Sequence, residues 1–157
     1  MFNTRSTGAG LIIFSRNGKQ VVLVESNYAD YNLGFPKGFI DKYETPKQAA
    51  IREANEETGL KIQELTFVPL QQPLVEYDPQ GNNEYYVAGV IDNNINQIQF
   101  RYNPYEIRST RWYSISDALQ LQKLYPNRKQ LLLHARQLYL KSKYRNKLLH
   151  GHQFIHS

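Results

Sequence analysis

The chain has 157 residues, of which 41% are hydrophobic and 13% aromatic, which suits one compact domain with a single core. It contains no cysteine, so disulfides, zinc–thiolate sites and thiol catalysis are excluded. The formal net charge of +5 is unevenly spread, because no acidic residue follows Asp117 whereas eight of the nineteen Lys and Arg residues do. No secretory signal pattern and no apolar run of roughly 20 residues is present, so we expect a cytoplasmic protein with no membrane partner.

The first predicted elements are two strands. Apolar and β-branched runs at residues 11–14 and 21–24 flank Asn17-Gly18, and Asn-Gly between such runs is a strong hairpin signal. We therefore expect the two strands to pair antiparallel. Residues 26–38 hold turn formers and aromatic residues, which predicts a loop.

A helix is predicted to follow, from Pro46 to Thr58. Thr45 can act as its N-cap, and proline at the first helical position loses no intrahelical hydrogen bond. Gly59 stands where helices commonly end in the left-handed conformation.

The second half of the chain also alternates strands and helices. Strands are expected at residues 65–70, 84–91, 97–101 and 110–113, with a turn at 78–81. Ser114 or Ser116 can cap a short helix reaching Lys123, and Asn127 can cap a longer one ending near Tyr144. We see no internal repeat or long linker. The expectation is one α/β domain over residues 1–157, with its core at about 7–143 and a basic C-terminal extension at 144–157.

The predicted helix of residues 46–58 carries an unusual cluster of acidic side chains. Glu53 lies three and four positions before Glu56 and Glu57, so the three carboxylates share one face. Like charges about 5.5 Å apart repel by roughly 3 kcal/mol at an effective dielectric near 20. The patch is therefore either solvated, with incidental ion pairs, or compensated by Arg52 and a hard cation, Mg²⁺ or alternatively Mn²⁺. The glycine-flanked turn at residues 34–38 favours the second interpretation, because its backbone can approach a metal or phosphate closely.

The spacing of these residues matches a known signature. Gly38, five residues, Glu44, seven residues and then Arg52-Glu53-Ala54-Asn55-Glu56-Glu57-Thr58-Gly59-Leu60 reproduce the pattern G-x5-E-x7-R-E-U-x-E-E-x-G-U of Nudix hydrolases. The chain therefore resembles that family, and residues 111–119 resemble the aromatic-containing strand that leads into the family's last helical region. The resemblance implies an α/β/α sandwich around a mixed β-sheet, with a catalytic loop–helix–loop. The motif residues are Gly38, Glu44, Arg52, Glu53, Glu56, Glu57 and Gly59.

The resemblance also implies roles for these residues. Glu56 and Glu57 would be the main Mg²⁺ ligands, and Glu53 would be a further ligand or the group that activates water. Gly38 would offer its carbonyl to the metal. Arg52 would orient a glutamate. Glu44 would stabilise the motif through Arg52 or its neighbours.

Family members often use a glutamate outside the motif as the base or as an extra ligand. Glu106 lies five residues before Arg111-Trp112, a spacing that resembles diadenosine tetraphosphate hydrolases, so we prefer it for that catalytic role. Glu84, at the start of a predicted strand, is the second candidate and a possible substrate contact. An ordinary surface glutamate is the alternative interpretation of each.

The reaction implied is metal-dependent hydrolysis of a pyrophosphate bond in a nucleoside diphosphate linked to another group, by attack of water on phosphorus. Phe35-Pro36-Lys37-Gly38 resembles the turn of dinucleoside tetraphosphate hydrolases and of mRNA-decapping members. A dinucleoside polyphosphate such as diadenosine tetraphosphate is the best guess, and an RNA 5′-end pyrophosphohydrolase or decapping enzyme is the alternative. Diphosphoinositol polyphosphate phosphohydrolases, which usually read P-G-G-G there, and non-catalytic nucleotide- or RNA-binding modules are further alternatives.

Some residues outside the motif are candidates for substrate contact. Lys37 is expected to contact phosphate, and Tyr28, Tyr31, Tyr77 or Tyr85 to stack on a base, although packing is the commoner role of any single tyrosine. The basic C-terminal helix would contact RNA, if RNA is the substrate, through Lys141, Lys143, Arg145 and Lys147. The oligomeric state is left open.

Overall fold

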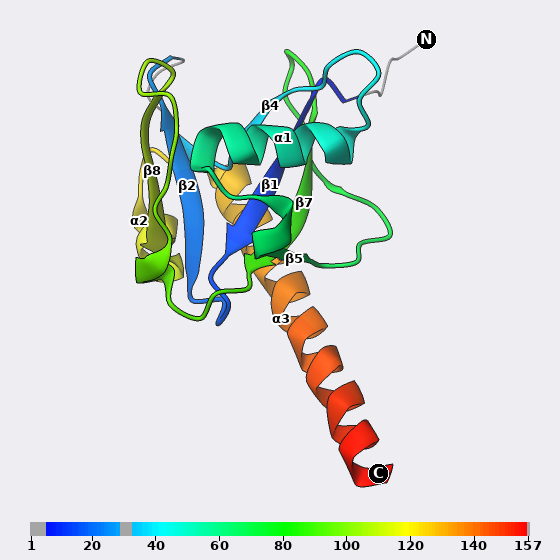
Figure 1. The fold of residues 1–157 in the computed structure, drawn as a ribbon. Coiled ribbons are helices and arrows are strands. Elements are labelled where there is room, and N and C mark those ends of the chain that lie inside the picture. Colours follow the sequence, from blue (N-terminus) through cyan, green and yellow to red (C-terminus); the bar gives the residue numbers. More distant parts are fainter. Residues whose placement is uncertain (1–5, 29–32, 157) are drawn as a thin grey trace.

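The computed structural model describes residues 6–28 and 33–156, with side chains to Leu148, and places one mixed sheet between helices (Figure 1). The helices are α1 (Pro46–Thr58), α2 (Ile115–Gln120) and α3 (Pro126–His156), with short 3₁₀ turns η2 (Ile62–Glu64) and η3 (Ile95–Gln97). The strands are β1 (Gly8–Phe14), β2 (Gln20–Ser26), β3 (Leu33–Gly34), β4 (Lys37–Phe39), β5 (Leu65–Phe67), β6 (Leu74–Glu76), β7 (Asn83–Val90) and β8 (Ile107–Ser114).

The sheet mixes both pairing directions. β1 and β7 run parallel in the register that sets Gly8 opposite Asn83 and Phe14 opposite Gly89. The pairs β1–β2, β1–β4, β2–β3, β2–β8, β5–β7 and β6–β7 are antiparallel. The expected mixed sheet is confirmed.

The two faces of the sheet carry separate cores, because side chains alternate along a strand. Leu11 and Ile13 of β1 pack with Ala49, Ala50 and Ala54 of α1. On the opposite face, the intervening β1 side chains pack with residues of α2 and α3, namely Ile12 and Phe14 with Ala118, Leu132, Ala135 and Tyr139. Helices therefore cover both faces, which confirms the α/β/α sandwich (Figure 1).

The predicted hairpin is confirmed, and the predicted loop after it needs correction. Gly18 adopts a φ of 75° in the turn that joins β1 to β2, where glycine is favoured. Within the segment 26–38, β3 pairs with β2 and β4 pairs with β1, which sets Lys37 opposite Gly10. Strands of two or three residues are too short to show an alternating hydrophobic pattern in the sequence. They form because longer neighbouring strands pair with them. Their pairing brings the turn at 34–38 beside α1.

The predicted limits of α1 are those of the structure. The Thr45 hydroxyl accepts from the Gln48 backbone N–H at 3.1 Å, and the Gln48 side chain accepts from the Thr45 N–H at 2.9 Å. This reciprocal pair is a capping box. At the other end Gly59 has a φ of 81° and its N–H donates to the Asn55 carbonyl at 2.8 Å. Local hydrogen bonds therefore determine both ends of α1.

The strands of the second half were predicted with mixed success. β7 and β8 and the turn at 78–81 are confirmed, and β5 is shorter than the expected 65–70. The strand expected at 97–101 is wrong, because η3 and irregular backbone occupy it and Phe100 packs on Trp112 with ring centroids 5.7 Å apart. β6 was not predicted.

The last two helices also differ from expectation. Ser114 caps α2 by accepting from the Asp117 N–H, but α2 ends at Gln120, short of Lys123. α3 begins before Asn127 and continues past Tyr144 to His156, leaving the body of the domain (Figure 1). Asn127 does not cap α3, because it lies within the helix and its side-chain amide donates to Glu76. Among the described residues, no helix is long and apolar enough to cross a bilayer.

Candidate active site

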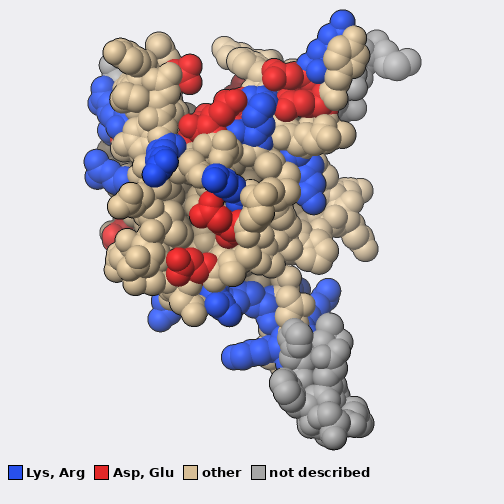
Figure 2. All heavy atoms as spheres, in the orientation of Figure 1, with Lys and Arg blue, Asp and Glu red and all other residues tan. Residues whose placement is uncertain are grey.

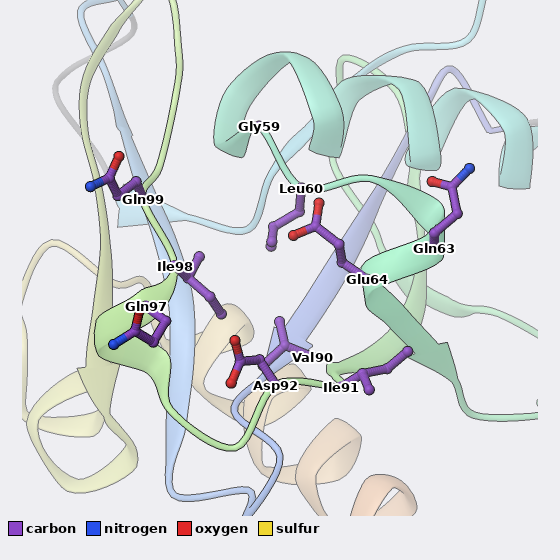
Figure 3. A pocket seen from close by; sticks show the side chains of 10 residues that line it. All are labelled: Gly59, Leu60, Gln63, Glu64, Val90, Ile91, Asp92, Gln97, Ile98 and Gln99. Carbon is purple, nitrogen blue, oxygen red and sulfur yellow. The ribbon is translucent and has the colours of Figure 1, made fainter.

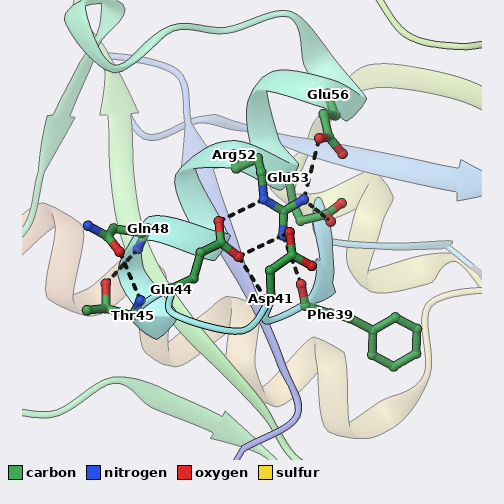
Figure 4. Close-up of polar contacts among 8 residues, drawn as sticks. All are labelled: Phe39, Asp41, Glu44, Thr45, Gln48, Arg52, Glu53 and Glu56. Carbon is green, nitrogen blue, oxygen red and sulfur yellow. Dashed lines mark hydrogen bonds and ion pairs between the residues drawn. The ribbon is translucent and has the colours of Figure 1, made fainter.

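Arg52 is the centre of a polar cluster on α1 (Figure 4). Its Nε and Nη2 donate to the two carboxylate oxygens of Glu44 at 2.8 and 2.9 Å, and Nη1 donates to Glu53 Oε1 at 2.7 Å. Nη2 also donates to the Phe39 carbonyl at 2.9 Å. One guanidinium thus ties the loop before α1 to the helix, and its bonds to Glu44 lower the pKa of that carboxyl.

Glu53 and Gly38 lie in direct contact. A Cβ atom at Gly38 would stand 2.1 Å from Cδ of Glu53, so only glycine lets the carboxylate lie against β4 in this way. The Glu53 side chain is 14% exposed. Burial raises its pKa, and the hydrogen bond from Arg52 opposes that rise.

Glu57 lies deeper in the same cluster. Its Oε1 accepts from the Lys37 backbone N–H at 3.1 Å. Burial raises the pKa of Glu57 to about 8; the Lys37 N–H opposes the rise, and the charges of Glu53 and Glu56 add to it. A nearby cation would favour the ionised form of this carboxyl.

The donor chemistry of the cluster fits a hard divalent cation, because Glu53, Glu56 and Glu57 offer carboxylate oxygens only. In the part of the chain that the structure describes, no three His, Asp or Glu side chains are gathered to hold a metal ion by themselves. Arg52 Nη1 instead donates to both Glu53 and Glu56, at 2.7 and 3.4 Å. Mg²⁺ commonly takes one or two carboxylates plus waters and substrate phosphates. The residues therefore suit an ion shared with substrate.

A cleft of about 430 Å³ opens beside these glutamates, a size that suits a small-molecule ligand. Glu57 and Lys37 line it together with Tyr28, so the structure brings these three predicted residues together. The first residues of α3 and the turn after β6 complete the wall. The other lining residues are Val24, Ser26, Gly34, Phe35, Asp78, Gln80, Ile107, Tyr125 and Arg128.

The two glutamates predicted outside the motif lie apart from each other. Glu106 is exposed in the turn before β8, and its carbonyl accepts from the Asn27 N–H at 2.9 Å, next to the cleft residue Ile107. Glu84 is half-buried on β7, where the Tyr86 hydroxyl donates to it at 3.5 Å. Glu84 does not line the cleft.

The tyrosines predicted to stack on a base lie in different parts of the structure. Tyr85 is fully buried and belongs to the core, so it does not stack on a ligand. Tyr77 is 77% exposed and lines a different hollow, beside Asn127 and His134. Tyr31 lies outside the described residues.

Sequence reasoning missed Tyr125 and Arg128 as wall residues of the cleft. Their only signal was a position next to the start of the predicted last helix. The packing of the last helix across the sheet decides which strands lie beside its first residues. The sequence pattern does not contain that information.

A second pocket, of about 420 Å³, lies beyond the C-terminal end of α1 (Figure 3). Glu64 and Asp92 line it, and it has no Lys or Arg in its wall. Its acidic lining is poorly suited to a polyphosphate, and of the motif residues it contains only Gly59. The cleft beside Glu57 is the better candidate.

Comparisons with known proteins agree with this geometry. The family model for the NUDIX domain matches residues 4–135. A bis(5′-nucleosyl)-tetraphosphatase (asymmetrical) of Caenorhabditis elegans is 27% identical over 118 residues, which cover 72% of this chain and 82% of that protein. The solved C. elegans Ap4A hydrolase superposes with a TM-score of 0.66 at 26% identity, covering 86% of this chain and 98% of that chain.

An RNA pyrophosphohydrolase of Tolumonas auensis is 38% identical over 68 residues, or 43% of this chain. The chain matches only 38% of the length of that relative. With the family model extending over most of the chain and the motif cluster in place on α1, the chain belongs to the NUDIX domain family.

Proposed function

We propose that the protein hydrolyses a phosphoanhydride bond of a dinucleoside polyphosphate such as diadenosine tetraphosphate. The observation that carries the proposal is the shared cleft, in which Glu57 of the motif helix meets Lys37, Tyr28 and Tyr125. A carboxylate, a cation and aromatic rings are what a nucleotide with a scissile pyrophosphate requires.

Each group has a definite task in this proposal. Mg²⁺ or Mn²⁺, held by Glu56, Glu57 and the Gly38 carbonyl, would supply positive charge to the polyphosphate and make a water ligand more acidic. Glu53 takes the proton from the attacking water. Arg52 holds Glu53 in place through the 2.7 Å hydrogen bond.

The remaining groups bind substrate or offer a second base. Lys37 contacts phosphate, and Tyr28 and Tyr125 hold a base by stacking. Glu106 is the alternative base, since its turn lies against the cleft at Ile107.

The match to the tetraphosphatase supports a dinucleoside substrate, because it extends over 72% of this chain and 82% of that protein. Relatives named for RNA substrates also match: the RNA pyrophosphohydrolase over 43% of this chain, and the m7GpppN-mRNA hydrolase dcap-2 of C. elegans at 34% identity over 69% of this chain but 13% of that protein. The dinucleoside substrate is therefore favoured by the extent of the match along the relative's own chain. Residues outside the motif determine substrate choice in a fold that hosts many activities.

The test is a substrate panel with Mg²⁺: diadenosine tetra- and hexaphosphate, 5′-triphosphorylated and capped RNA, nucleoside triphosphates, ADP-ribose and a diphosphoinositol phosphate. Products are resolved by chromatography. Cleavage of a dinucleoside polyphosphate ahead of the others, lost in Glu56→Gln and kept in Glu64→Gln, supports the proposal. Glu64 is an exposed carboxylate outside the cleft. If every compound stays intact while one still binds, the protein is a binding module instead.

RNA is the second candidate substrate because α3 carries exposed cations beyond the body of the domain. Lys141, Arg145 and Lys147 are exposed, and basic side chains gather where α3 emerges (Figure 2). Lys143 is partly engaged, since it donates to the Arg16 carbonyl. For single strands, each phosphate contact contributes about −0.7 to the slope of log affinity against log salt. Replacing these four residues by Gln should make the slope shallower by about 3 if RNA binds here, and an unchanged slope would reject this contact.

A further inference from the structure

A buried carboxylate supports one wall of the cleft. Glu76, at the end of β6, is 4% exposed. Its Oε1 accepts from Asn83 Nδ2 and the Tyr85 hydroxyl, both at 3.0 Å, and its Oε2 accepts from Asn127 Nδ2 at 3.2 Å and Arg128 Nε at 2.8 Å. A buried charge needs this degree of pairing to be tolerated. Glu76 thereby joins β6 and β7 to the start of α3.

Arg128 is held rigidly by these contacts. Besides its bond to Glu76, Nη1 donates to the Leu33 carbonyl at 2.9 Å. A Cβ atom at Gly34 would stand 2.9 Å from Nη1, so glycine makes room for the guanidinium. Arg128 also lies over the ring of Tyr125, whose centroid is 5.8 Å from Cζ.

One nitrogen of this fixed guanidinium has no partner among residues 6–28 and 33–156. Nε and Nη1 are engaged, and no described group accepts from Nη2. Arg128 lines the cleft, and its side chain is 14% exposed. The cleft wall therefore contains a guanidinium that Glu76 and the Leu33 carbonyl hold in place beside an aromatic ring.

The charge of this donor is already balanced. Glu76 neutralises Arg128 across 2.8 Å, which makes the pair a weak attractor for a phosphate but a good donor to an uncharged acceptor. Lys37 is different, because within the described residues its side chain has no ion pair and its own backbone holds Glu57. Phosphate therefore belongs beside Lys37, and a base belongs beside Tyr125 and Arg128.

We infer that Arg128, positioned by Glu76, reads the base of the bound nucleotide and favours guanine over adenine. Guanine offers the acceptors O6 and N7 on one edge, whereas adenine offers N7 beside the N6 amino group, which is a donor. A second donor facing the guanidinium is unfavourable. Asp78 in the same cleft supplies an acceptor of the kind that the guanine amino group requires. The inference rests on the proposed function in taking the cleft as a nucleotide site, and within the proposed class of dinucleoside polyphosphates it makes guanine, rather than the adenine of diadenosine tetraphosphate, the preferred base.

The experiment is calorimetric titration of GDP and ADP, in Mg²⁺, into the full chain. A hydrogen bond from a charged group contributes about 1.5–3 kcal/mol, which predicts that GDP binds on the order of 10- to 100-fold more tightly than ADP. In Arg128→Lys the single side-chain nitrogen stays with Glu76, so the preference should fall to about 3-fold or less. Lys129→Gln removes a cation from the next position of the same helix, outside the cleft, and should leave the preference intact.

Altered ligands test the same contact without altering the protein. 7-Deaza-GDP lacks N7, and the diphosphate of 2-aminopurine riboside lacks O6. At least one should bind the unmodified protein about 5-fold or more weakly than GDP. If neither does, or if GDP and ADP bind equally, the inference is wrong. This arm also decides the matter if Arg128→Lys does not fold. If a folded Arg128→Lys protein binds GDP and ADP more weakly by the same factor, Arg128 contacts phosphate or supports the structure, and the inference is wrong.

Hydrolysis of diguanosine and diadenosine tetraphosphate separates this inference from the proposed function. If neither is cleaved but GDP binding still depends on Arg128, the proposed function fails and the base-reading role stands. If both are cleaved with equal kcat/KM, the base-reading role fails and the proposed function stands.

Discussion

Arg52 and Glu44 form a two-pronged ion pair, with Nε to Oε2 at 2.8 Å and Nη2 to Oε1 at 2.9 Å. The same guanidinium donates to Glu53, so the loop that precedes α1 and the glutamate that we propose as base share one anchor (Figure 4). Arginine offers a planar fork, which lysine cannot reproduce.

Arg52→Lys should therefore lower kcat by about 10- to 100-fold, the usual effect of removing a group that orients a site residue, while KM changes little. Steady-state kinetics on the substrate identified by the panel provide the measurement. Arg111→Lys is the matched control, since Arg111 is exposed on β8. Equal effects of the two substitutions would show that Arg52 does not orient Glu53.

Gly38→Ala should separate activity from stability. The added Cβ meets the end of the Glu53 side chain at 2.1 Å, and that side chain can rotate away, so unfolding free energy should change by less than about 1 kcal/mol. Displacing the proposed base should cost activity about 100-fold.

Gly10→Ala is the contrasting variant. Its Cβ would meet the Pro36 backbone carbonyl at 2.2 Å, which cannot rotate away, so we expect about 1–3 kcal/mol of destabilisation in urea unfolding. A Gly38→Ala protein that is destabilised as strongly as Gly10→Ala would contradict the side-chain explanation.

The raised pKa of Glu57 predicts a pH dependence of stability. Its folded-state pKa of about 8 exceeds the ordinary 4.5, so the folded protein holds this proton more tightly than the unfolded chain. The resulting stabilisation of the folded state is fully present below about pH 4.5 and is lost as the pH rises through about 8. The total loss in the free energy of unfolding is at most about 5 kcal/mol.

Urea unfolding in EDTA between pH 5 and 8.5 measures this effect. Glu57→Gln should flatten the fall in stability toward high pH, while Glu64→Gln should leave it unchanged. Mg²⁺ should restore more stability to the unmodified protein at pH 8 than at pH 5, because it binds the ionised carboxylate. Identical pH profiles for Glu57→Gln and the unmodified protein would exclude Glu57 as the titrating group.

Gly59→Ala should destabilise α1 through the backbone. Gly59 has a φ of 81°, and a Cβ there would lie 3.0 Å from Arg101 Cβ and 3.1 Å from Arg101 N. The left-handed conformation costs an ordinary residue about 1–2 kcal/mol. Gly59→Asn should cost less, since asparagine tolerates this conformation, and thermal unfolding of the two variants compares them. Similar losses would assign the effect to crowding at Arg101 instead.

The sequence by itself determined the features that local hydrogen bonds or fixed spacing control. The limits of α1 follow from Thr45, Pro46 and Gly59, whose capping contacts all lie within a few residues. The motif glutamates could be located for the same reason, since their spacing on one helix sets their mutual positions.

The tertiary structure decided what depends on contacts between distant segments. β6 exists because it pairs with β7, and the segment at 97–101 is irregular despite its apolar residues. Glu76 and Arg128 meet across 52 positions in the chain, and only the packing of α3 on the sheet brings them together beside the cleft. Short-range patterns carry no information about such meetings, so the base-reading wall of the site emerged only with the fold.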